Sequence, residues 1–246
     1  MSKYILIIGA SGFLGTHFLS HLTSQHSLNI ITVDLNPLQE PHCTNPNILH
    51  LQIDASMEDI LEYLPKDNSD IELIIINLVA IDYPVGKDGL SGSDDFSTPF
   101  SLTLNEFHES LRVTLGTSYN IIRLIDRYNL NNCHLVLVGS MYGEIIPPPE
   151  LYSKMSDTYK PIAYSVAKAG QKMLLKQAAT YLPKFGGRCN SISFGGIYAS
   201  QSNAFVEKYS SIAPQSRMIL IEEAVQSLYW LAFDSPSAIN GINLLC

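Results

Sequence analysis

The sequence predicts an α/β protein built on a Rossmann-type, doubly wound parallel sheet of about seven strands with helices on both faces. Three observations predict it. Short β-branched runs alternate with longer helical patterns, the first run leads straight into a glycine-rich turn, and the second run ends in an acidic residue. This alternation is typical of βαβ units, whose parallel strands are buried on both faces.

The expected elements follow this alternation along the chain. Strands are expected over Tyr4–Ile8, Asn29–Val33, Ile48–Ile53, Leu73–Val79, His134–Val138, Cys189–Phe194 and Ile242–Leu245. Helices are expected over Phe13–Gln25, Met57–Leu64, Leu102–Tyr128, Pro161–Leu182 and Glu222–Phe233. No repeat or linker-like stretch is visible in the sequence, so residues 1–246 are expected to form one domain.

The composition indicates a compact protein without a large basic surface. Hydrophobic residues make up 46% of the 246 residues, charged residues make up 15%, and the formal net charge is −8. No Lys/Arg cluster appears. Nucleic acid and an anionic membrane are therefore excluded as main partners, because phosphate-rich surfaces require concentrated positive charge.

The N-terminal run and the cysteines predict the compartment. The run Tyr4–Ile8 is too short for a membrane span and enters a glycine turn rather than a cleavage site, so we expect a strand and not a signal peptide. The four scattered cysteines form no C-x-x-C pair, which favours a reducing compartment over a zinc site or a disulfide framework. A cytoplasmic protein without a bound metal is expected.

The turn after the first strand carries a dinucleotide-binding pattern. Gly9-Ala-Ser-Gly12-Phe-Leu-Gly15 lies between a strand and a helix, where glycines bring backbone N–H groups and a helix N-terminus close to a pyrophosphate. The alternative is a tight turn without a ligand. Asp34 ends the second strand, and no Lys or Arg follows it closely. An acid at that position accepts hydrogen bonds from ribose hydroxyls and repels the extra phosphate of NADP, so NAD is the predicted cofactor.

Two further sets of residues allow more than one interpretation. Asp54 and Ala55, at the end of the third strand, are expected at the adenine edge, although Asp54 could instead cap a helix that begins near Met57. His17 and His21 are one helical turn apart, as two metal ligands would be. No third ligand is apparent in the sequence, so these histidines are expected to face solvent.

A tyrosine and a lysine predict the chemistry. Tyr164 and Lys168 are spaced to lie one turn apart on one face of a helix. A neighbouring cation stabilises a phenolate, so the pair can take a proton from an alcohol or return it to a ketone. Ser140, at the end of the fifth strand, is expected to hold the substrate oxygen, or else to cap its own turn. Tyr83 and Lys87 repeat the spacing, but Pro84 and Gly86 lie between them, which excludes a regular helix there.

Long connections predict where the substrate binds. Asp82–Pro99 and Gly143–Lys160 follow strands at the carboxyl side of the sheet, where open α/β sheets bind ligands. Both are longer than ordinary turns. We expect them, with a third near residues 195–215, to be substrate loops rather than plain surface connections.

Together these residues resemble the short-chain dehydrogenase/reductase (SDR) family over nearly the whole chain. Asn77-Leu-Val-Ala80, Asn190-Ser-Ile-Ser-Phe-Gly-Gly-Ile197 and the stretch from Arg217 to Leu244 extend the resemblance. Within the family, the sequence is similar to the oxidoreductases of flagellin-glycan and nonulosonate pathways.

The resemblance implies roles for individual residues. Ser140 would position the substrate, Tyr164 would be the acid/base, and Lys168 would tune Tyr164 and hold the ribose. The loop through Ile197 would contact the nicotinamide through its backbone. The residues expected at the cofactor are Gly9, Ser11, Gly12, Phe13, Leu14, Gly15, Asp34, Asp54, Ala55, Asn77, Leu78, Val79, Tyr164, Lys168, Gly195 and Ile197.

The sequence departs from the family pattern at two places near the expected site. The catalytic asparagine expected in the helix around Leu111–Gly116 has no counterpart, and Arg112, Val113 and Thr114 stand there. Phe194 replaces the usual proline before the Gly-Gly turn.

The predicted function is an NAD-dependent dehydrogenase or reductase acting on a hydroxyl or keto group of a sugar or nucleotide-linked sugar. One alternative is an epimerase or dehydratase of nucleotide sugars that retains its NAD. Another is a non-catalytic NAD-binding regulatory subunit. The resemblance also implies a homodimer or homotetramer that pairs the helices Leu102–Tyr128 and Pro161–Leu182.

Overall fold

The computed structural model describes residues 2–25, 28–64, 71–83, 96–156 and 159–246. In these parts of the chain, seven parallel strands form one sheet in the order β3-β2-β1-β4-β5-β6-β7. The strands are β1 Ser2–Ile8, β2 Asn29–Asp34, β3 Ile48–Gln52, β4 Ile71–Asn77, β5 Cys133–Ser140, β6 Arg188–Phe194 and β7 Asn243–Leu245. The strand order reverses between β1 and β4, and open α/β sheets bind ligands outside the carboxyl ends of strands at such a reversal.

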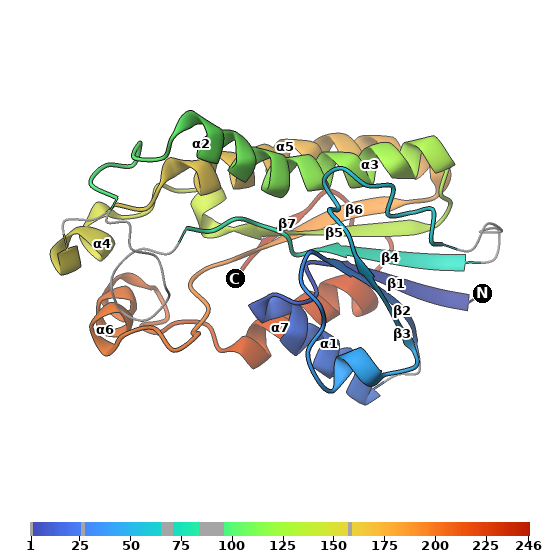
Figure 1. The fold of residues 1–246 in the computed structure, drawn as a ribbon, viewed down its shortest axis with the longest axis horizontal. Helices are drawn as coiled ribbons and strands as arrows, with labels where there is room; N and C mark the ends of the chain where they lie inside the picture. The colour runs from blue at the N-terminus through green and yellow to red at the C-terminus, as the bar shows by residue number, and fades with distance from the viewer. Residues whose placement is uncertain (1, 26–27, 65–70, 84–95, 157–158) are drawn as a thin grey trace.

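Helices cover both faces of the sheet (Figure 1). One face carries α1 (Phe13–Gln25) and α7 (Ile221–Tyr229), and the other carries α2 (Leu104–Leu111), α3 (Thr117–Tyr128) and α5 (Ile162–Tyr181). Two further helices, α4 (Pro149–Ser156) and α6 (Asn203–Ile212), lie beyond the carboxyl ends of the strands. The Rossmann-type fold predicted from the sequence is thus confirmed.

The alternation of side chains along β1 explains the two cores. Ile5 and Ile7 belong to the apolar cluster that includes residues of α1 and α7. Leu6 and Ile8 belong to the cluster that includes residues of α3 and α5. All four side chains are fully buried, as expected for a strand in the middle of a sheet that is covered on both faces.

The predicted helix over Leu102–Tyr128 is interrupted. A capping box of Thr103 and Glu106 begins α2 at Leu104, one π-helical stretch, η2, covers Arg112–Gly116, and α3 follows. A π-helical stretch widens the helix locally and releases backbone carbonyls from the regular ladder. The helix predicted over Glu222–Phe233 likewise ends in a π-helical stretch, Trp230–Asp234.

One other expectation, the helix over Met57–Leu64, was wrong. Residues 57–64 form turns and not a helix. The Asp54 carboxylate accepts the Ser56 amide, and the Asp54 carbonyl accepts the Met57 and Glu58 amides, but this helix-like start does not continue. The connections predicted over 143–160 and 195–215 contain α4 and α6. Ser202 caps α6 by accepting the Phe205 amide at 3.3 Å.

Among the helices of the described residues, none has both the length and the apolar character to cross a bilayer.

Candidate active site

The glycine turn at the end of β1 is closely packed. Gly9 has a φ of +84°, in the region that favours glycine, and its amide donates to the Val33 carbonyl at 2.8 Å. A Cβ atom at Gly15 would collide with the Gly9 carbonyl oxygen and would lie 2.8 Å from the Cα of Ala10. Helix α1 can therefore begin directly against the turn only because residue 15 has no side chain.

Asp34 lies beside this turn and fits a dinucleotide. Its carboxylate accepts the Ser11 amide at 3.0 Å and the Asn36 amide at 2.9 Å. The first amides of α1, at Phe13 and Leu14, have no partner within the helix and lie at its positive end. A pyrophosphate would rest on these amides and a ribose would contact Asp34, so the residues present fit the group.

The segment after β4 forms the other side of the turn. A Cβ atom at Gly9 would lie 3.1 Å from the Val79 nitrogen and 3.2 Å from the Leu78 carbonyl carbon. Asn77 accepts the Val79 amide at 3.1 Å and donates to Ser118 at 2.9 Å. The structure therefore brings the predicted Asn77–Val79 segment against the glycine turn.

Asp54 has partners within the protein. Arg112 Nη1 donates to its carboxylate at 2.8 Å and to the Ser56 hydroxyl, and Ser56 Oγ donates to Asp54 at 2.6 Å. These hydrogen bonds hold the pKa of Asp54 below its usual value against the opposing effect of burial. The neighbouring Ala55 carbonyl accepts from Asn120 at 2.9 Å. The sequence did not indicate this contact between Asp54 and η2.

Ser140, Tyr164 and Lys168 meet at the carboxyl end of the sheet. Ser140 ends β5, accepts the Tyr142 amide at 3.1 Å and hydrogen-bonds to Tyr164. It therefore caps its own turn and also lies next to Tyr164. Lys168 lies one turn further along α5, with Nζ 5.7 Å from the centre of the Tyr164 ring, and it donates to the Val138 carbonyl at 2.6 Å.

Burial dominates the electrostatics of this cluster. It raises the pKa of Tyr164, as does the charge of Asp82, while the hydrogen bond from Ser140 acts in the opposite direction. Burial also lowers the pKa of Lys168 to about 8, against an opposing effect of Asp82. Lys168 is only 2% exposed. At neutral pH the free protein therefore holds a protonated phenol beside a largely protonated amine.

Thr114 lies in the stretch where the family resemblance places a catalytic asparagine. Thr114, in η2, is buried, and its hydroxyl accepts the Ile81 amide at 3.0 Å. Its carbonyl accepts from Gln171 at 3.2 Å, and Gln171 also donates to Ser118 at 2.7 Å. The Thr114 carbonyl of η2 thus accepts a hydrogen bond from Gln171, which lies about one turn beyond Lys168 on α5.

The loop after β6 is fixed by α6. The Gly195 amide donates to the Cys246 carbonyl at 2.7 Å, and the Gly196 amide donates to the Tyr209 hydroxyl at 2.6 Å. The Ile197 carbonyl accepts from Gln201 at 3.0 Å. Phe194, in place of the usual proline, is 4% exposed and belongs to the core on the α1 and α7 side.

Helices α4 and α6 form a cap beside the cluster. Leu151 and Tyr152 of α4 pack with Tyr209 of α6 and with Met218 in a small separate core. The Tyr152 and Tyr142 hydroxyls lie 2.8 Å apart. This cap comes from two of the stretches that the sequence predicted as substrate loops.

Sequence reasoning missed two charged residues at the site. Lys160 forms an ion pair with Asp82, and its Nζ lies 5.6 Å from the centre of the Tyr164 ring. The available signal was spacing, because Lys160 precedes Tyr164 by the same four residues by which Lys168 follows it. Lys87 and most of the predicted 82–99 loop lie outside the described residues.

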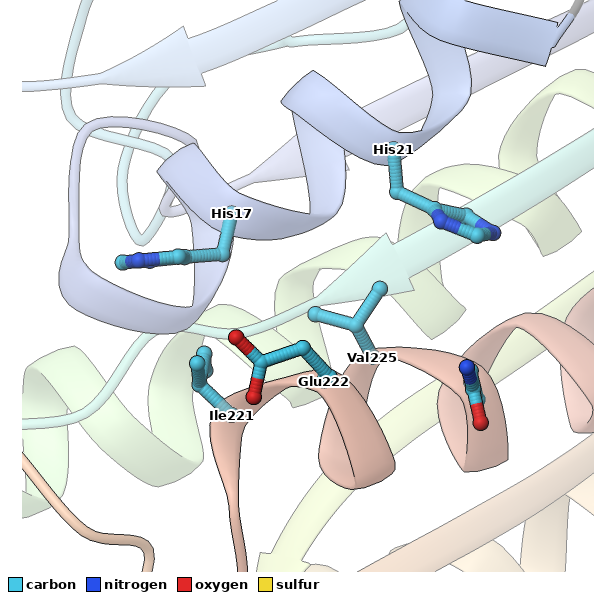
Figure 2. Close-up of a pocket in the computed structure, with 6 residues that line it drawn as sticks. His17, His21, Ile221, Glu222 and Val225 are labelled. Atoms are coloured by element: carbon cyan, nitrogen blue, oxygen red, sulfur yellow. The ribbon is translucent and has the colours of Figure 1, made fainter.

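His17 and His21 do not belong to this site. With Ile221, Glu222 and Val225 they line a pocket of about 160 Å³ between α1 and α7 (Figure 2), which is smaller than the roughly 300–1,000 Å³ of most ligand sites. His17 is exposed as predicted, whereas His21 is half-buried and packs against another aromatic ring. In the described chain, no group of three or more His, Cys, Asp or Glu could hold a metal.

The sheet, its glycine turn and the cluster around Tyr164 define the class of protein as a Rossmann-fold oxidoreductase. A family model described as Enoyl-(Acyl carrier protein) reductase matches residues 78–246. The chain belongs to the short-chain dehydrogenase/reductase family, which is a family of enzymes that use nicotinamide dinucleotides.

Individual relatives agree with this assignment. Post-translational flagellin modification protein A from Campylobacter coli is 24% identical over 258 aligned positions, which cover 99% of this chain and 96% of that protein. A short-chain dehydrogenase from Leptospira borgpetersenii, solved with bound NAD+, has a TM-score of 0.82 and 27% identity, covering 100% of this chain and 91% of the other. ElxO, solved with NADP bound, shares the fold, with a TM-score of 0.73, 19% identity, and coverage of 100% and 97%.

Proposed function

We propose that the chain is an NAD-dependent dehydrogenase or reductase that interconverts a hydroxyl and a keto group on a sugar or nucleotide-linked sugar. One observation carries the proposal. Tyr164 hydrogen-bonds to Ser140 and has the buried Lys168 one turn away, at the carboxyl end of β5.

The residues divide the proton chemistry among them. Ser140 holds the substrate oxygen, and Tyr164 gives its proton to that oxygen in reduction or removes one from it in oxidation. Lys168 stabilises the phenolate that reduction leaves behind. When bound, a nicotinamide dinucleotide supplies or accepts the hydride.

The preference for NAD rests on Asp34. The carboxylate is fixed by the Ser11 and Asn36 amides at the end of β2, where it would accept ribose hydroxyls and repel a 2′-phosphate. The NAD+ bound to the Leptospira relative supports the same choice.

The sugar substrate rests on the resemblance of the sequence to oxidoreductases of flagellin-glycan and nonulosonate pathways, with which the nearly full-length match to a flagellin modification protein agrees. The cap of α4 and α6 adds aromatic surface beside Tyr164, and aromatic side chains are frequent in the lining of small-molecule sites.

The test is incubation with NAD+ and a panel of free and nucleotide-linked sugars, following NADH absorbance and product mass together. NADH accumulation that Tyr164→Phe abolishes while retaining NADH binding is the expected result, with a rate loss of about 10²–10⁴. Equal rates in the variant would contradict the assignment of Tyr164.

Two other functions have distinct outcomes in the same test. A changed product without net NADH would indicate an epimerase or dehydratase that retains its NAD. NADH binding without turnover of any sugar would indicate a regulatory subunit. The defined Ser140–Tyr164–Lys168 geometry favours the dehydrogenase over the latter.

We also propose a homodimer or homotetramer in the cytoplasm that pairs the outer faces of α3 and α5. Tyr119 on α3 is 58% exposed, and Met173 and Val166 on α5 are 65% and 41% exposed. A monomer by light scattering would contradict the assembly.

A further inference from the structure

A second lysine lies next to Tyr164, on a part of the site that the reaction chemistry does not use. The Lys160 side chain is 8% exposed and pairs with Asp82, whose side chain is 50% exposed. Lys160 also donates to the Tyr83 carbonyl at 3.2 Å, and its Nζ lies 5.6 Å from the centre of the Tyr164 ring.

The pair belongs to a wall built from two distant segments. The Tyr159 amide donates to the Phe96 carbonyl at 2.8 Å, and the Ile162 amide donates to the Pro99 carbonyl at 3.0 Å. The ring of Phe96 meets that of Tyr83 edge to face at 6.1 Å. These backbone hydrogen bonds join Phe96 and Pro99, which follow β4 in the chain, to the segment that leads into α5 and Tyr164.

The geometry decides which group the wall can recognise. Lys160 is nearly enclosed and already has a carboxylate and a carbonyl as partners, so it has little capacity for an anionic substrate. A cation is disfavoured because the Lys160 charge compensates Asp82 and would repel it. Among the described residues, Lys160 is the one ion-pair partner of the half-exposed Asp82 carboxylate. The lone pairs that remain in this part of the structure suit a neutral donor such as a hydroxyl group.

We propose that Asp82 is a specificity-determining residue that accepts a hydrogen bond from a substrate hydroxyl near the reacting carbon, with Lys160 as the positioning residue that orients it. The inference rests on the proposed function and narrows its substrate class to hydroxylated ketones and the corresponding polyols. The field of Asp82 reaches both Tyr164 and Lys168, since its charge raises the pKa of each, which agrees with a carboxylate that faces the reacting groups.

The test compares two ketones of similar size, hydroxyacetone and 2-butanone, which differ by a hydroxyl in place of a methyl group. Their binding to the NADH-loaded full chain is measured by the change in NADH fluorescence. The wild type should prefer hydroxyacetone by about tenfold to a hundredfold, the range for a hydrogen bond to a charged group. Asp82→Ala should remove the preference.

A matched control and a rescue keep the test specific. Asp126 is 49% exposed and pairs with Lys184 at 3.4 Å, so Asp126→Asn removes a similarly exposed ion pair elsewhere and should leave the preference unchanged. Lys160→Met should weaken the preference and Lys160→Arg should restore it, since a structural role would not depend on retaining a cation. Unchanged NADH affinity and far-UV circular dichroism show that each variant is folded.

The outcomes separate this inference from the proposed function. No binding of hydroxyacetone, no preference in the wild type, or an unchanged preference in Asp82→Ala would overturn the role of Asp82. A preference that depends on Asp82, without oxidation of any sugar, would instead overturn the dehydrogenase assignment and leave the recognition role standing.

Discussion

Replacing Lys168 with methionine should lower alcohol oxidation at neutral pH about a hundredfold. The lysine Nζ lies 5.7 Å from the centre of the Tyr164 ring. A unit charge stabilises a phenolate at that separation by about 3 kcal/mol at an effective dielectric constant near 20, and about 1.4 kcal/mol corresponds to a factor of ten. Burial lowers the pKa of Lys168 to about 8, so the charge is present at pH 7 and declines above pH 8.

The assay is kcat/KM for oxidation of the best alcohol of the sugar panel, with NAD+, from about pH 6 to about pH 10. The deficit of Lys168→Met should be largest below pH 8 and should shrink above it, because the wild type then loses the same charge. Lys176→Met, on the exposed side of α5, is the control and should match the wild type. Wild-type activity in Lys168→Met at pH 7, or a deficit independent of pH, would refute the electrostatic reasoning.

Three further predictions concern the cofactor turn and the core. Gly15→Ala should lower the unfolding free energy, measured by denaturant titration, by about 1–3 kcal/mol and should weaken NADH binding, because the added Cβ would collide with the Gly9 carbonyl oxygen. Gly116→Ala is the control and should be nearly neutral, because its Cβ would have its nearest neighbour at 3.8 Å. Asp34→Asn should improve the use of NADP relative to NAD by about tenfold or more in the ratio of kcat/KM values, and an unchanged ratio would contradict the role of the carboxylate. Burial lowers the pKa of His134 to about 3, so between about pH 6.5 and pH 3 the unfolded chain binds a proton that the native protein does not. Lowering the pH through this interval should therefore reduce the unfolding free energy by up to about 4–5 kcal/mol. His134→Gln should flatten that part of the stability curve, and an unchanged slope would argue against a buried neutral imidazole.

Most of the fold could be predicted because its signals are local. All seven strands were predicted close to their observed bounds, most of them from β-branched runs, and α1 was predicted with its observed bounds, Phe13–Gln25. The interruption of the predicted helix at Arg112–Gly116 had no such signal, since no proline marks it in the sequence.

The site could be predicted where residues meet within one motif. Tyr164 and Lys168 lie on one helix, and Ser140 ends a strand that a sequence pattern identifies. The partners Asp82 and Lys160 are far apart in the sequence and meet only through the wall beside α5, so no spacing rule joins them. The cap helices α4 and α6 were missed. They come from segments far apart in the sequence, and residues of both meet in a small core of their own, which no local pattern indicates.

The enclosure of Lys168 sets folding against activity. An amine whose pKa is about 8 in the native protein and near 10.4 in the unfolded chain disfavours the folded state by about 3 kcal/mol at neutral pH. This destabilisation is lost as the pH rises from about 8 to about 10.4, so the unfolding free energy increases over that interval. Over the same interval Lys168 loses the positive charge that lies beside Tyr164. A high pH therefore stabilises the fold and removes the charge that supports Tyr164 in catalysis. Selection for heat resistance alone would act against Lys168.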